Sequence, residues 1–538
     1  MEVTVTMKAA KRILLGSAAG LVAVAGAQAA DLPVKARAID YVKICSLYGE
    51  GFFYIPGTDT CLKVGGWVRF DAQFNNPGNN NPLGNSLNTR SQSPDFATQT
   101  RTVLSVDTRS QTEYGTLRAY YRGGFELTTG GAGAYGNGSY YTERAFIQLG
   151  GFTFGKSVSF FDIFSNQWSL SAAGYAAAGS NTAAFFGTNL AAYTAQFGSG
   201  LSATLSVEDN TVRRNALWDA ASVNNLTIGN YPGPQSSTPL GYYGCATGLG
   251  TTDTGGATTV GCTVGDYAAQ QIPDIVANVR VDQAWGSAQV SAALHQVRGD
   301  FYGANTGNSP LFTGVAPPNA WGWAVNGGIS INLPWNPGDR FWVEGTYDVG
   351  ASSYTGFGWL QGYNGPMTRF SGADVATGWA LDGVFGTQAQ GGIALSTAWD
   401  VTAALEHYWT PALRSSVWGS YTVWQPGSTG NNIMCGSATN NLVVAATGAK
   451  LSTSGNAAAQ AACNFSFDTW QVGTRTIWNP VKNLDLGLEV AYQQIDPKMG
   501  NLIGYNFAGS GTRATGIYTP ASEGNFSGMF RIQRNFYP

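Results

Sequence analysis

The sequence predicts an all-β protein, a sixteen-stranded antiparallel barrel that crosses a membrane with its strands. Three observations lead to this prediction: apolar and polar residues alternate in many segments, charged residues are scarce, and connections alternate between short and long. The alternation is clearest over 484–493, where even positions are apolar and odd positions are acidic, amide or small. A period of two places these two sets on opposite faces of a strand. One face therefore contacts an apolar medium and the other contacts water.

The composition is typical of a barrel in lipid. Charged residues make up 11% of the 538 residues, whereas soluble domains contain about 25%. Glycine is abundant, at 72 residues, and aromatic residues reach 13%. Half of each barrel strand faces lipid, which accounts for the low charge. The net charge is −3 and no basic run occurs, so the sequence does not indicate nucleic acid as a partner.

Alternating runs bounded by turn residues predict sixteen strands. Their approximate ranges are 62–74, 99–110, 115–127, 140–149, 152–157, 189–197, 201–208, 274–284, 287–299, 321–333, 339–350, 398–408, 412–424, 466–478, 484–495 and 526–536. In the first strand, Arg69 and Asp71 lie on one face, whereas Val68 and Phe70 lie on the other. Charged residues are rarely buried without partners, so the charged face is predicted to line a water-filled lumen.

The connections between these strands alternate in length. Several contain two to five residues, whereas the segments 158–188, 209–273, 351–397 and 425–465 are long. Long loops without secondary structure are uncommon in compact soluble domains. They are usual on the extracellular side of outer-membrane barrels, whose periplasmic turns are short. An even number of strands then leaves both ends of the barrel domain in the periplasm.

The N-terminus is predicted to be a secretory signal peptide, residues 1–29. A basic start precedes an apolar stretch and the small-residue cleavage site Ala27-Gln28-Ala29. Residues 1–6 are interpreted as a start-site extension. Residues 30–61 are expected to form a periplasmic segment and residues 62–538 the pore domain. No other segment reaches 18 apolar residues, so no transmembrane helix is predicted.

Six cysteines form three couples that are close in sequence, Cys45 with Cys61, Cys245 with Cys262, and Cys435 with Cys463. Six cysteines allow fifteen connectivities, and the sequence alone does not choose among them. Export to an oxidising compartment favours disulfides over metal binding, and none of the couples has CxxC spacing. We expect the local pairing.

Several motifs resemble the porins of alphaproteobacteria. They are DLPVKA at 31–36, CSLYG at 45–49, FYIPGTDTCLK at 53–63, AFIQL at 145–149 with GFTFG at 151–155 and FFD at 160–162, and FRIQRNF at 530–536. The resemblance implies a homotrimer of sixteen-stranded barrels in outer-membrane lipid. It also implies passive diffusion of small hydrophilic solutes and ions, with the third loop, 158–188, folded into the lumen.

The narrowest part of such a pore is expected at the third loop, whose one charged residue is Asp162. Arginines near the middle of the last, first, third and fourth strands are expected to face it, namely Arg531, Arg69, Arg118, Arg122 and Arg144. Guanidinium groups stay charged, so this row opposite a loop carboxylate would set a transverse field that favours small polar solutes. The scarcity of loop acids suggests a preference for anions. The alternative is that these arginines line the lumen away from the constriction.

The sequence shows no catalytic set, cofactor motif or metal cluster. Its two histidines, His295 and His407, each lie in a strand and are interpreted as wall or rim residues. Three other functions stay open: a solute-selective channel, a barrel enzyme with its catalytic residues at the rim, and a surface adhesin that uses the loops. The general diffusion pore is preferred, because the other channel and the enzyme need a dedicated site that is not evident.

Overall fold

The computed structural model describes twelve stretches of the chain. They are residues 43–75, 96–128, 139–164, 168–170, 187–220, 267–268, 270–302, 315–357, 367–437, 440, 442–507 and 515–537. The predicted signal peptide lies outside the described residues, as do Cys245 and Cys262. Most of the third loop also lies outside them, although its residues 158–164 and 168–170 are described.

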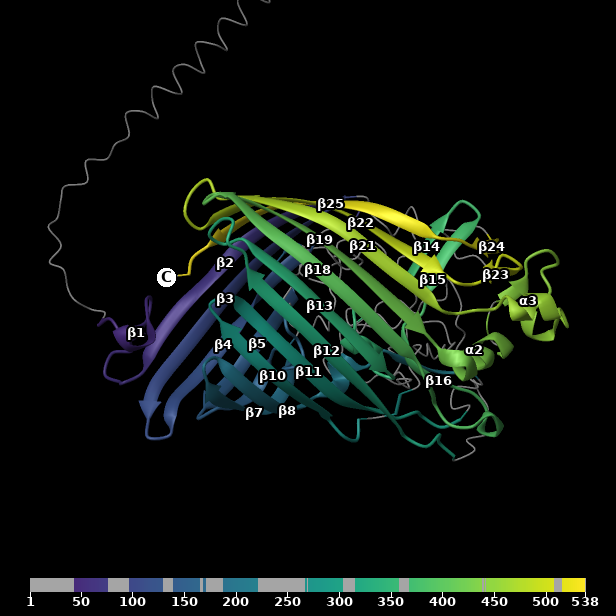
Figure 1. Cartoon of the computed structure of the whole chain (residues 1–538), viewed down its shortest axis with the longest axis horizontal. Coiled ribbons are helices and arrows are strands. Elements are labelled where there is room, and N and C mark those ends of the chain that lie inside the picture. The colour runs from purple at the N-terminus through teal and green to yellow at the C-terminus, as the bar shows by residue number, and fades with distance from the viewer. Residues whose placement is uncertain are drawn as a thin grey trace, which may run out of the picture. The chain divides into compact units, whose positions relative to one another are not determined.

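Sixteen strands form a closed antiparallel barrel (Figure 1). Closure occurs at β2, which pairs on one side with β3 and on the other with β25. The strands are β2 (Cys61–Phe74), β3 (Phe96–Thr112), β4 (Gly115–Thr128), β5 (Ser139–Leu149), β6 (Phe152–Ser157), β7 (Thr188–Gly198), β8 (Leu201–Glu208), β10 (Asp274–Gln283), β11 (Gly286–Val297), β12 (Ala320–Asn332), β13 (Arg340–Val349), β18 (Thr397–Thr410), β19 (Leu413–Gln425), β21 (Phe467–Trp478), β22 (Leu484–Pro497) and β25 (Glu523–Asn535). The predicted barrel is confirmed, and each predicted strand agrees within three residues at both ends.

The two faces of the strands follow the predicted alternation. On β22, Leu488 is 58% exposed and Val490 is 47% exposed on the outer surface, whereas Glu489 and Gln493 are buried on the lumen side. The outer surface of the barrel is therefore apolar at membrane depth, as a lipid-facing wall requires.

A charge on this outer face is expected to destabilise the barrel. Leu488→Arg should lower the free energy of unfolding by about 2–4 kcal/mol, the cost of a basic side chain near the bilayer midplane. Denaturant unfolding in lipid vesicles measures it. The control is Val481→Arg, because Val481 lies exposed in the turn before β22, where surface substitutions change stability by no more than about 0.5 kcal/mol. Equal losses in the two variants would contradict the assignment of the lipid face.

The described parts of the long connections fold, which differs from the expectation of loops without secondary structure. One small sheet contains β9 (Ala216–Asp219), β16 (Leu381–Phe385) and β17 (Ala394–Leu395). A second contains β14 (Met367–Ser371), β15 (Asp374–Gly378), β20 (Leu442–Val444), β23 (Ile503–Phe507) and β24 (Gly516–Pro520). These strands have two to five residues, too few to show a clear alternation. β14 and β15 form a hairpin, whereas β9 pairs with β16 and β15 pairs with β24 across long separations.

Short helices accompany these sheets. They are η3 (Asn210–Arg213), η4 (Ser352–Tyr354), η6 (Gln388–Gln390), α2 (Gly427–Gly436), η7 (Leu451–Thr453) and α3 (Ala457–Ala461). Within the described residues, no helix has the length and hydropathy needed to cross a membrane. Sheets and helices share a buried core that includes Trp218, Phe357, Trp424 and Phe467. The connections therefore build a packed cap at one end of the barrel (Figure 1).

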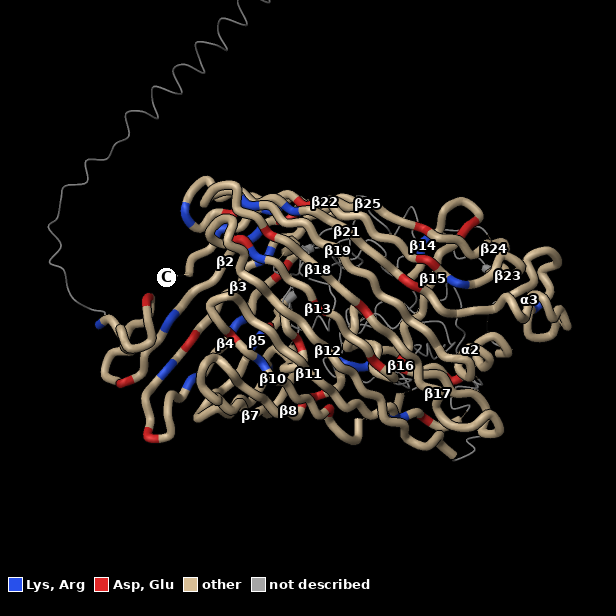
Figure 2. The backbone as a smooth tube through the Cα atoms, in the orientation of Figure 1, with Lys and Arg blue, Asp and Glu red and all other residues tan. Residues whose placement is uncertain are grey.

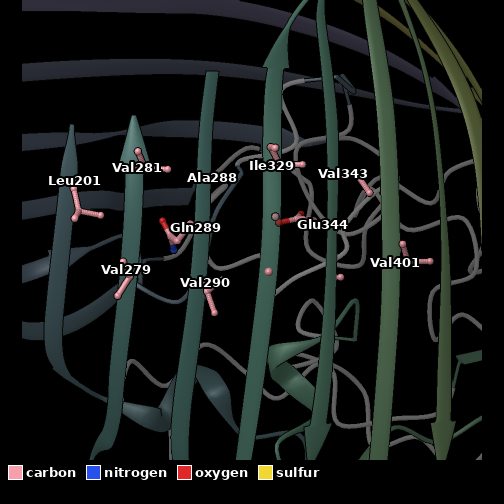
Figure 3. Close-up of a pocket in the computed structure, with 13 residues that line it drawn as sticks. Leu201, Val279, Val281, Ala288, Gln289, Val290, Ile329, Val343, Glu344 and Val401 are labelled. Atoms are coloured by element: carbon pink, nitrogen blue, oxygen red, sulfur yellow. The ribbon is translucent and has the colours of Figure 1, made fainter. Parts of the chain in front are cut away.

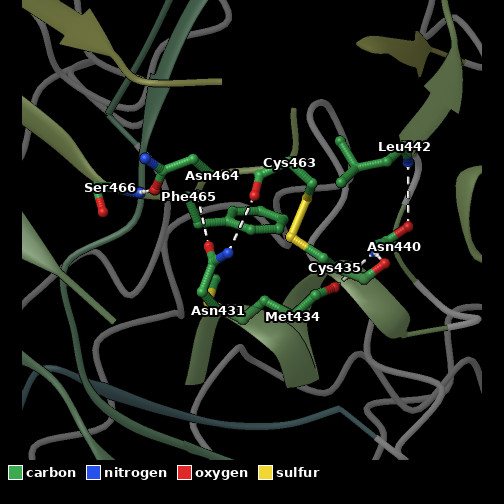
Figure 4. The surroundings of a disulfide bond; sticks show 9 residues. All are labelled: Asn431, Met434, Cys435, Asn440, Leu442, Cys463, Asn464, Phe465 and Ser466. Carbon is green, nitrogen blue, oxygen red and sulfur yellow. Dashed lines mark hydrogen bonds between the residues drawn. A yellow bond between two sulfur atoms is a disulfide. The ribbon is translucent and has the colours of Figure 1, made fainter. Parts of the chain in front are cut away.

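A disulfide between Cys435 and Cys463 joins α2 to the end of α3 (Figure 4). The Asn431 side chain connects the same two segments, because its Nδ2 donates to the Cys463 carbonyl (3.0 Å) and its Oδ1 accepts from the Phe465 N–H (2.9 Å). Closing a chain segment of this length typically stabilises a fold by about 3 kcal/mol. This is one of the local pairings that the sequence suggests.

The other described disulfide, Cys45–Cys61, holds a small motif at the start of β2. The motif contains η1 (Ser46–Tyr48) and β1 (Phe53–Tyr54), which pairs with the first residues of β2. The guanidinium of Arg109 on β3 lies 4.9 Å from the centre of the Phe52 ring. This motif therefore packs against the end of the barrel that carries the short turns.

Candidate functional site: the lumen and its third loop

The third loop, which follows β6, lies against the inner wall of the barrel. Its first contacts are with β8, β10 and β11. Glu208 Oε1 accepts from the Phe160 N–H (3.0 Å), and the Phe160 carbonyl accepts from Asn278 Nδ2 (2.6 Å) and Gln289 Nε2 (3.2 Å). These side chains all project from the lumen face, so the loop enters the lumen.

The loop reaches a second set of contacts on the far side of the lumen. Glu489 Oε2 on β22 accepts from the Leu170 N–H (2.6 Å), and Arg475 Nη1 on β21 donates to the Ser169 carbonyl (3.4 Å). The Trp168 ring is buried, with its centre 5.7 Å from that of Trp342 on β13. The described loop residues therefore span the wall from β8 to β22, which confirms that the third loop folds into the lumen.

Asp162 forms an ion pair inside the protein. Arg213 Nη2 lies 3.2 Å from Asp162 Oδ1, and both side chains are almost completely buried. The Arg213 guanidinium also lies 4.5 Å from the centre of the Tyr354 ring, and Phe161 packs edge-on against that ring at 4.7 Å. This cluster, the loop anchor, consists of Phe161, Asp162, Arg213 and Tyr354, and it ties the third loop to η3 and η4.

A buried polar network extends from the loop anchor. The Tyr354 hydroxyl donates to Asp274 Oδ2 (2.6 Å), and His295 Nδ1 hydrogen bonds to Asp274 Oδ1 (2.9 Å). Tyr267 donates from its hydroxyl to Asp382 Oδ2 (2.7 Å) on β16. Burial raises the pKa of Tyr354 well above its ordinary value, and the charge of Asp274 adds to this. Tyr354 therefore stays a neutral donor at physiological pH, and the network links the loop anchor to the cap.

The arginines predicted to face the third loop lie on adjacent strands. Five strands, β25 and β2 to β5, carry the arginine wall, which we define as Arg69, Arg101, Arg109, Arg118, Arg122, Arg144 and Arg531 (Figure 2). Arg69 is directly opposite Arg101, and Arg122 is directly opposite Arg144. Five of these seven were predicted from the sequence. Arg101 and Arg109 were not, although both share the parity of the lumen-facing Asp107.

Four acids pair with the arginine wall. Asp71 accepts from Arg531 (2.6 Å), and Glu126 pairs with Arg101 (2.5 Å). Asp107 pairs with both Arg109 and Arg118, and Glu143 pairs with Arg122. Among the described residues of these five strands, seven arginines thus share four carboxylates, which gives this side of the lumen a positive excess.

Glu143 faces the lumen because β5 contains a bulge. The register with β4 pairs Arg122 with Arg144 and Gly123 with Thr142, which leaves Glu143 as an extra residue. A bulge places two consecutive side chains on the same side of a strand. Strict alternation would have placed Glu143 in lipid, so its position in the lumen could not be predicted from residue parity.

The opposite side of the lumen is acidic. We define the acidic wall as the buried carboxylates on β8, β10, β13 and β18, namely Glu208, Asp274, Glu344, Asp348, Asp400 and Glu406. In the order of the barrel, β13 is eight strands from β4, so the two walls face each other. The third loop lies against the acidic wall, and Asp162 lies with it on this side. Positive side chains therefore predominate on one side of the lumen and carboxylates on the other.

A cavity of about 550 Å³ follows the wall between β8 and β18 (Figure 3). Most of its lining residues are valine, isoleucine, leucine and glycine, and the polar ones are Gln289 and Glu344. Gly327 and Gly345 are directly opposite each other on β12 and β13, and no atom of the described residues lies within 4 Å of where a Cβ of Gly327 would be. The absence of side chains at this point leaves the wall thin.

Comparisons with known proteins agree with this architecture. A family model described as "Porin subfamily" matches residues 31–519. Porin Omp2b of Brucella canis is 38% identical over 213 residues, which cover 37% of this chain and 53% of that protein. Porin Omp2a of Brucella ovis is 37% identical over 223 residues, which cover 37% of this chain and 59% of that protein. The chain thus spans a little over half the length of the curated relatives it matches.

Among solved structures, the outer membrane channel DcaP of Acinetobacter baumannii is similar in fold. It aligns with a TM-score of 0.54 over 90% of this chain and 99% of that chain, at 14% sequence identity. At this identity, the likeness concerns the fold alone.

Proposed function

The chain belongs to the porin subfamily, and on that premise we propose that it forms a water-filled channel for passive diffusion of small hydrophilic solutes and ions. Its family and its barrel fold place it in the outer membrane. The observation that carries the proposal is the lumen itself, where two walls of opposite charge face each other and the described part of the third loop lies against one of them.

We assign the constriction to the space between the third loop and the arginine wall. Arg69, Arg118, Arg122, Arg144 and Arg531 supply positive charge on one side of that space. The acidic wall supplies negative charge on the other side, and Asp162 positions the loop through the loop anchor. A transverse field orders water, which polar solutes can replace and apolar solutes cannot. The positive excess of the arginine wall supports a preference for anions.

Single-channel recording of the purified protein in planar bilayers tests this function. We expect a conductance that rises with salt without saturation, and a reversal potential that shows anion preference in a salt gradient. Saturable conductance blocked by one solute would support a solute-selective channel instead. A folded, membrane-inserted protein without conductance would contradict the proposal and would favour a surface adhesin or another barrel function.

The homotrimer is also a proposal, and the outer face of β3 supports it. The outward positions Thr98, Thr100 and Thr102 form a polar stripe at a depth where lipid favours apolar side chains. Outward positions on β12, such as Trp321, Trp323 and Val325, are apolar by comparison. A protein surface offers the threonines better contacts than acyl chains do, so we place a second copy of this chain against β3.

Cross-linking in membranes tests this interface. Thr100→Cys, labelled with a short reagent that has one thiol-reactive and one photoreactive end, is expected to give a high yield of cross-linked chains, because β3 of one copy lies near the next copy. Val472→Cys, on the outer face of β21, is the matched control and should give few cross-linked chains. Equal yields for both variants would contradict the placement of the interface.

The division of the chain stays a proposal as well. We propose that residues 1–29 are removed, that 30–61 lie in the periplasm, and that 62–538 form the pore domain. The family match begins at residue 31, close to the predicted cleavage site. N-terminal sequencing of the exported protein is expected to start at residue 30.

A further inference from the structure

Beneath the third loop, a group of polar side chains on β12, β13 and β18 has no hydrogen-bond partners among the residues that the structure describes. The group consists of Asn326, Glu344, Thr346 and Thr402. Glu344 is directly opposite Thr402, and Thr346 is directly opposite Asn326. Residues directly opposite in antiparallel strands have Cβ atoms about 5 Å apart. The four side chains therefore form one compact patch on the lumen face.

The third loop closes over this patch. A Cβ at Gly328, directly opposite Glu344, would lie 2.9 Å from Ile163 Cδ1 and 3.2 Å from Phe164 Cε2. The same Cβ would lie 2.9 Å from the Cβ of Glu344. Ile163 and Phe164 thus pack directly beside Glu344, and Gly328 is the residue that leaves them room. All four polar residues are at least 96% buried as a result.

The polar atoms of this patch lack hydrogen bonds. Within the described part of the chain, both carboxylate oxygens of Glu344, both amide atoms of Asn326 and the hydroxyls of Thr346 and Thr402 have no partner. Neighbouring buried carboxylates do find donors: Asp400 Oδ1 accepts from the Thr346 N–H at 3.0 Å, and Glu208 accepts from Phe160. Glu344 is thus an exception within the acidic wall.

The charges around Glu344 also disfavour an ionised carboxylate at this position. The charges with the largest effect on Glu344 are those of Asp400 and Asp162, and both are negative. The described residues form no ion pair with Glu344. A buried carboxylate without a hydrogen bond or an opposite charge is costly by several kcal/mol. A bound cation removes this cost, because it supplies positive charge and satisfies the oxygens at once.

We infer that this patch binds a hard cation such as Ca²⁺ behind the third loop. The Glu344 carboxylate is the charged ligand, and the Thr346 and Thr402 hydroxyls and the Asn326 carbonyl oxygen are the neutral ligands. Hard cations prefer such oxygen ligands. Among the described residues, no three or more acidic, histidine or cysteine side chains cluster as a metal site. The site therefore depends on one carboxylate with neutral oxygens and water, which corresponds to weak, extracellular-type affinity of about 10⁻⁴–10⁻³ M.

Terbium luminescence tests the site without measuring conductance. Tb³⁺ replaces Ca²⁺ at oxygen sites and emits when a nearby tryptophan is excited. Trp342 lies two residues from Glu344 on the same face of β13, and Trp168 packs against Trp342. Titration of the folded protein in detergent with Tb³⁺ is expected to give saturable emission that added Ca²⁺ displaces. Wild-type protein without saturable emission would overturn the inference.

Two variants and one control assign the signal to the patch. Glu344→Gln is expected to weaken Tb³⁺ binding at least about tenfold, because it removes the charged ligand. Thr402→Val has nearly the same shape and removes a hydroxyl that the protein does not use, so it should fold normally and bind Tb³⁺ more weakly. Asp282→Asn is the control, since Asp282 is an exposed carboxylate that pairs with Arg280 near the short turns. Unchanged affinity in both Glu344→Gln and Thr402→Val would overturn the inference.

Discussion

Replacement of Arg69, Arg101 and Arg122 together by glutamine is expected to reverse the ion preference of the pore. The arginine wall would then hold four arginines and four acids, whereas the acidic wall opposite would be unchanged. A lumen lined by one sign of charge concentrates the opposite ion. The reversal potential in a salt gradient should therefore change from the anion side to the cation side, and bilayer recording measures it.

Arg280→Gln is the matched control for this experiment. Arg280 also carries a lumen-side guanidinium, but it lies near the short turns and pairs with the exposed Asp282 at 2.8 Å. Exposed ion pairs contribute little, so the reversal potential should stay close to that of the wild type. If the triple variant kept the anion preference, the arginine wall would not set the selectivity.

Arg213→Met is expected to release the start of the third loop. The substitution leaves Asp162 buried without its positive partner, and breaking one side of a buried pair costs about 3–5 kcal/mol. The Tyr354 and Phe161 contacts of the loop anchor would weaken with it. We expect a lower thermal transition and a single-channel record that fluctuates among several conductance levels rather than one.

A double variant separates charge from packing. Arg213→Met combined with Asp162→Asn removes both charges, and replacement of a buried pair by groups of similar volume is often close to neutral. The double variant should therefore recover most of the lost stability and the steady conductance level. A double variant no better than Arg213→Met would show that the ion pair does not hold the loop.

Most of the barrel could be predicted, because odd and even positions of a strand point to opposite faces and the two faces contact different media. Arg69, Asp71 and Leu488 lie on the faces that their positions indicate, since one wall contacts water and the other lipid. The same rule failed at Glu143, where a bulge shifts the parity. The opposing Gly123-Gly124 pair was the available signal, because glycines in a strand often mark a bulge or a close backbone approach.

The loop anchor could not be predicted. Arg213 and Asp162 are 51 residues apart and lie in segments without periodicity, so their contact depends on how the cap folds over the lumen. The expectation for Asp162 was a carboxylate facing the arginines, and the structure adds that it pairs with Arg213. The unpartnered atoms around Glu344 are likewise visible only after the third loop is in place.

The parallel pairing of β9 with β16 constrains the order of folding. Ala216 is opposite Leu381, a separation of 165 residues (381 minus 216), whereas neighbouring barrel strands such as β3 and β4 are joined by a two-residue turn. Contacts between distant residues form slowly, because closing the long intervening loop lowers the chain entropy before the contact energy is gained. The hairpins of the barrel should therefore form before the cap. The mouth of the channel would fold last, after the chain has inserted in the bilayer.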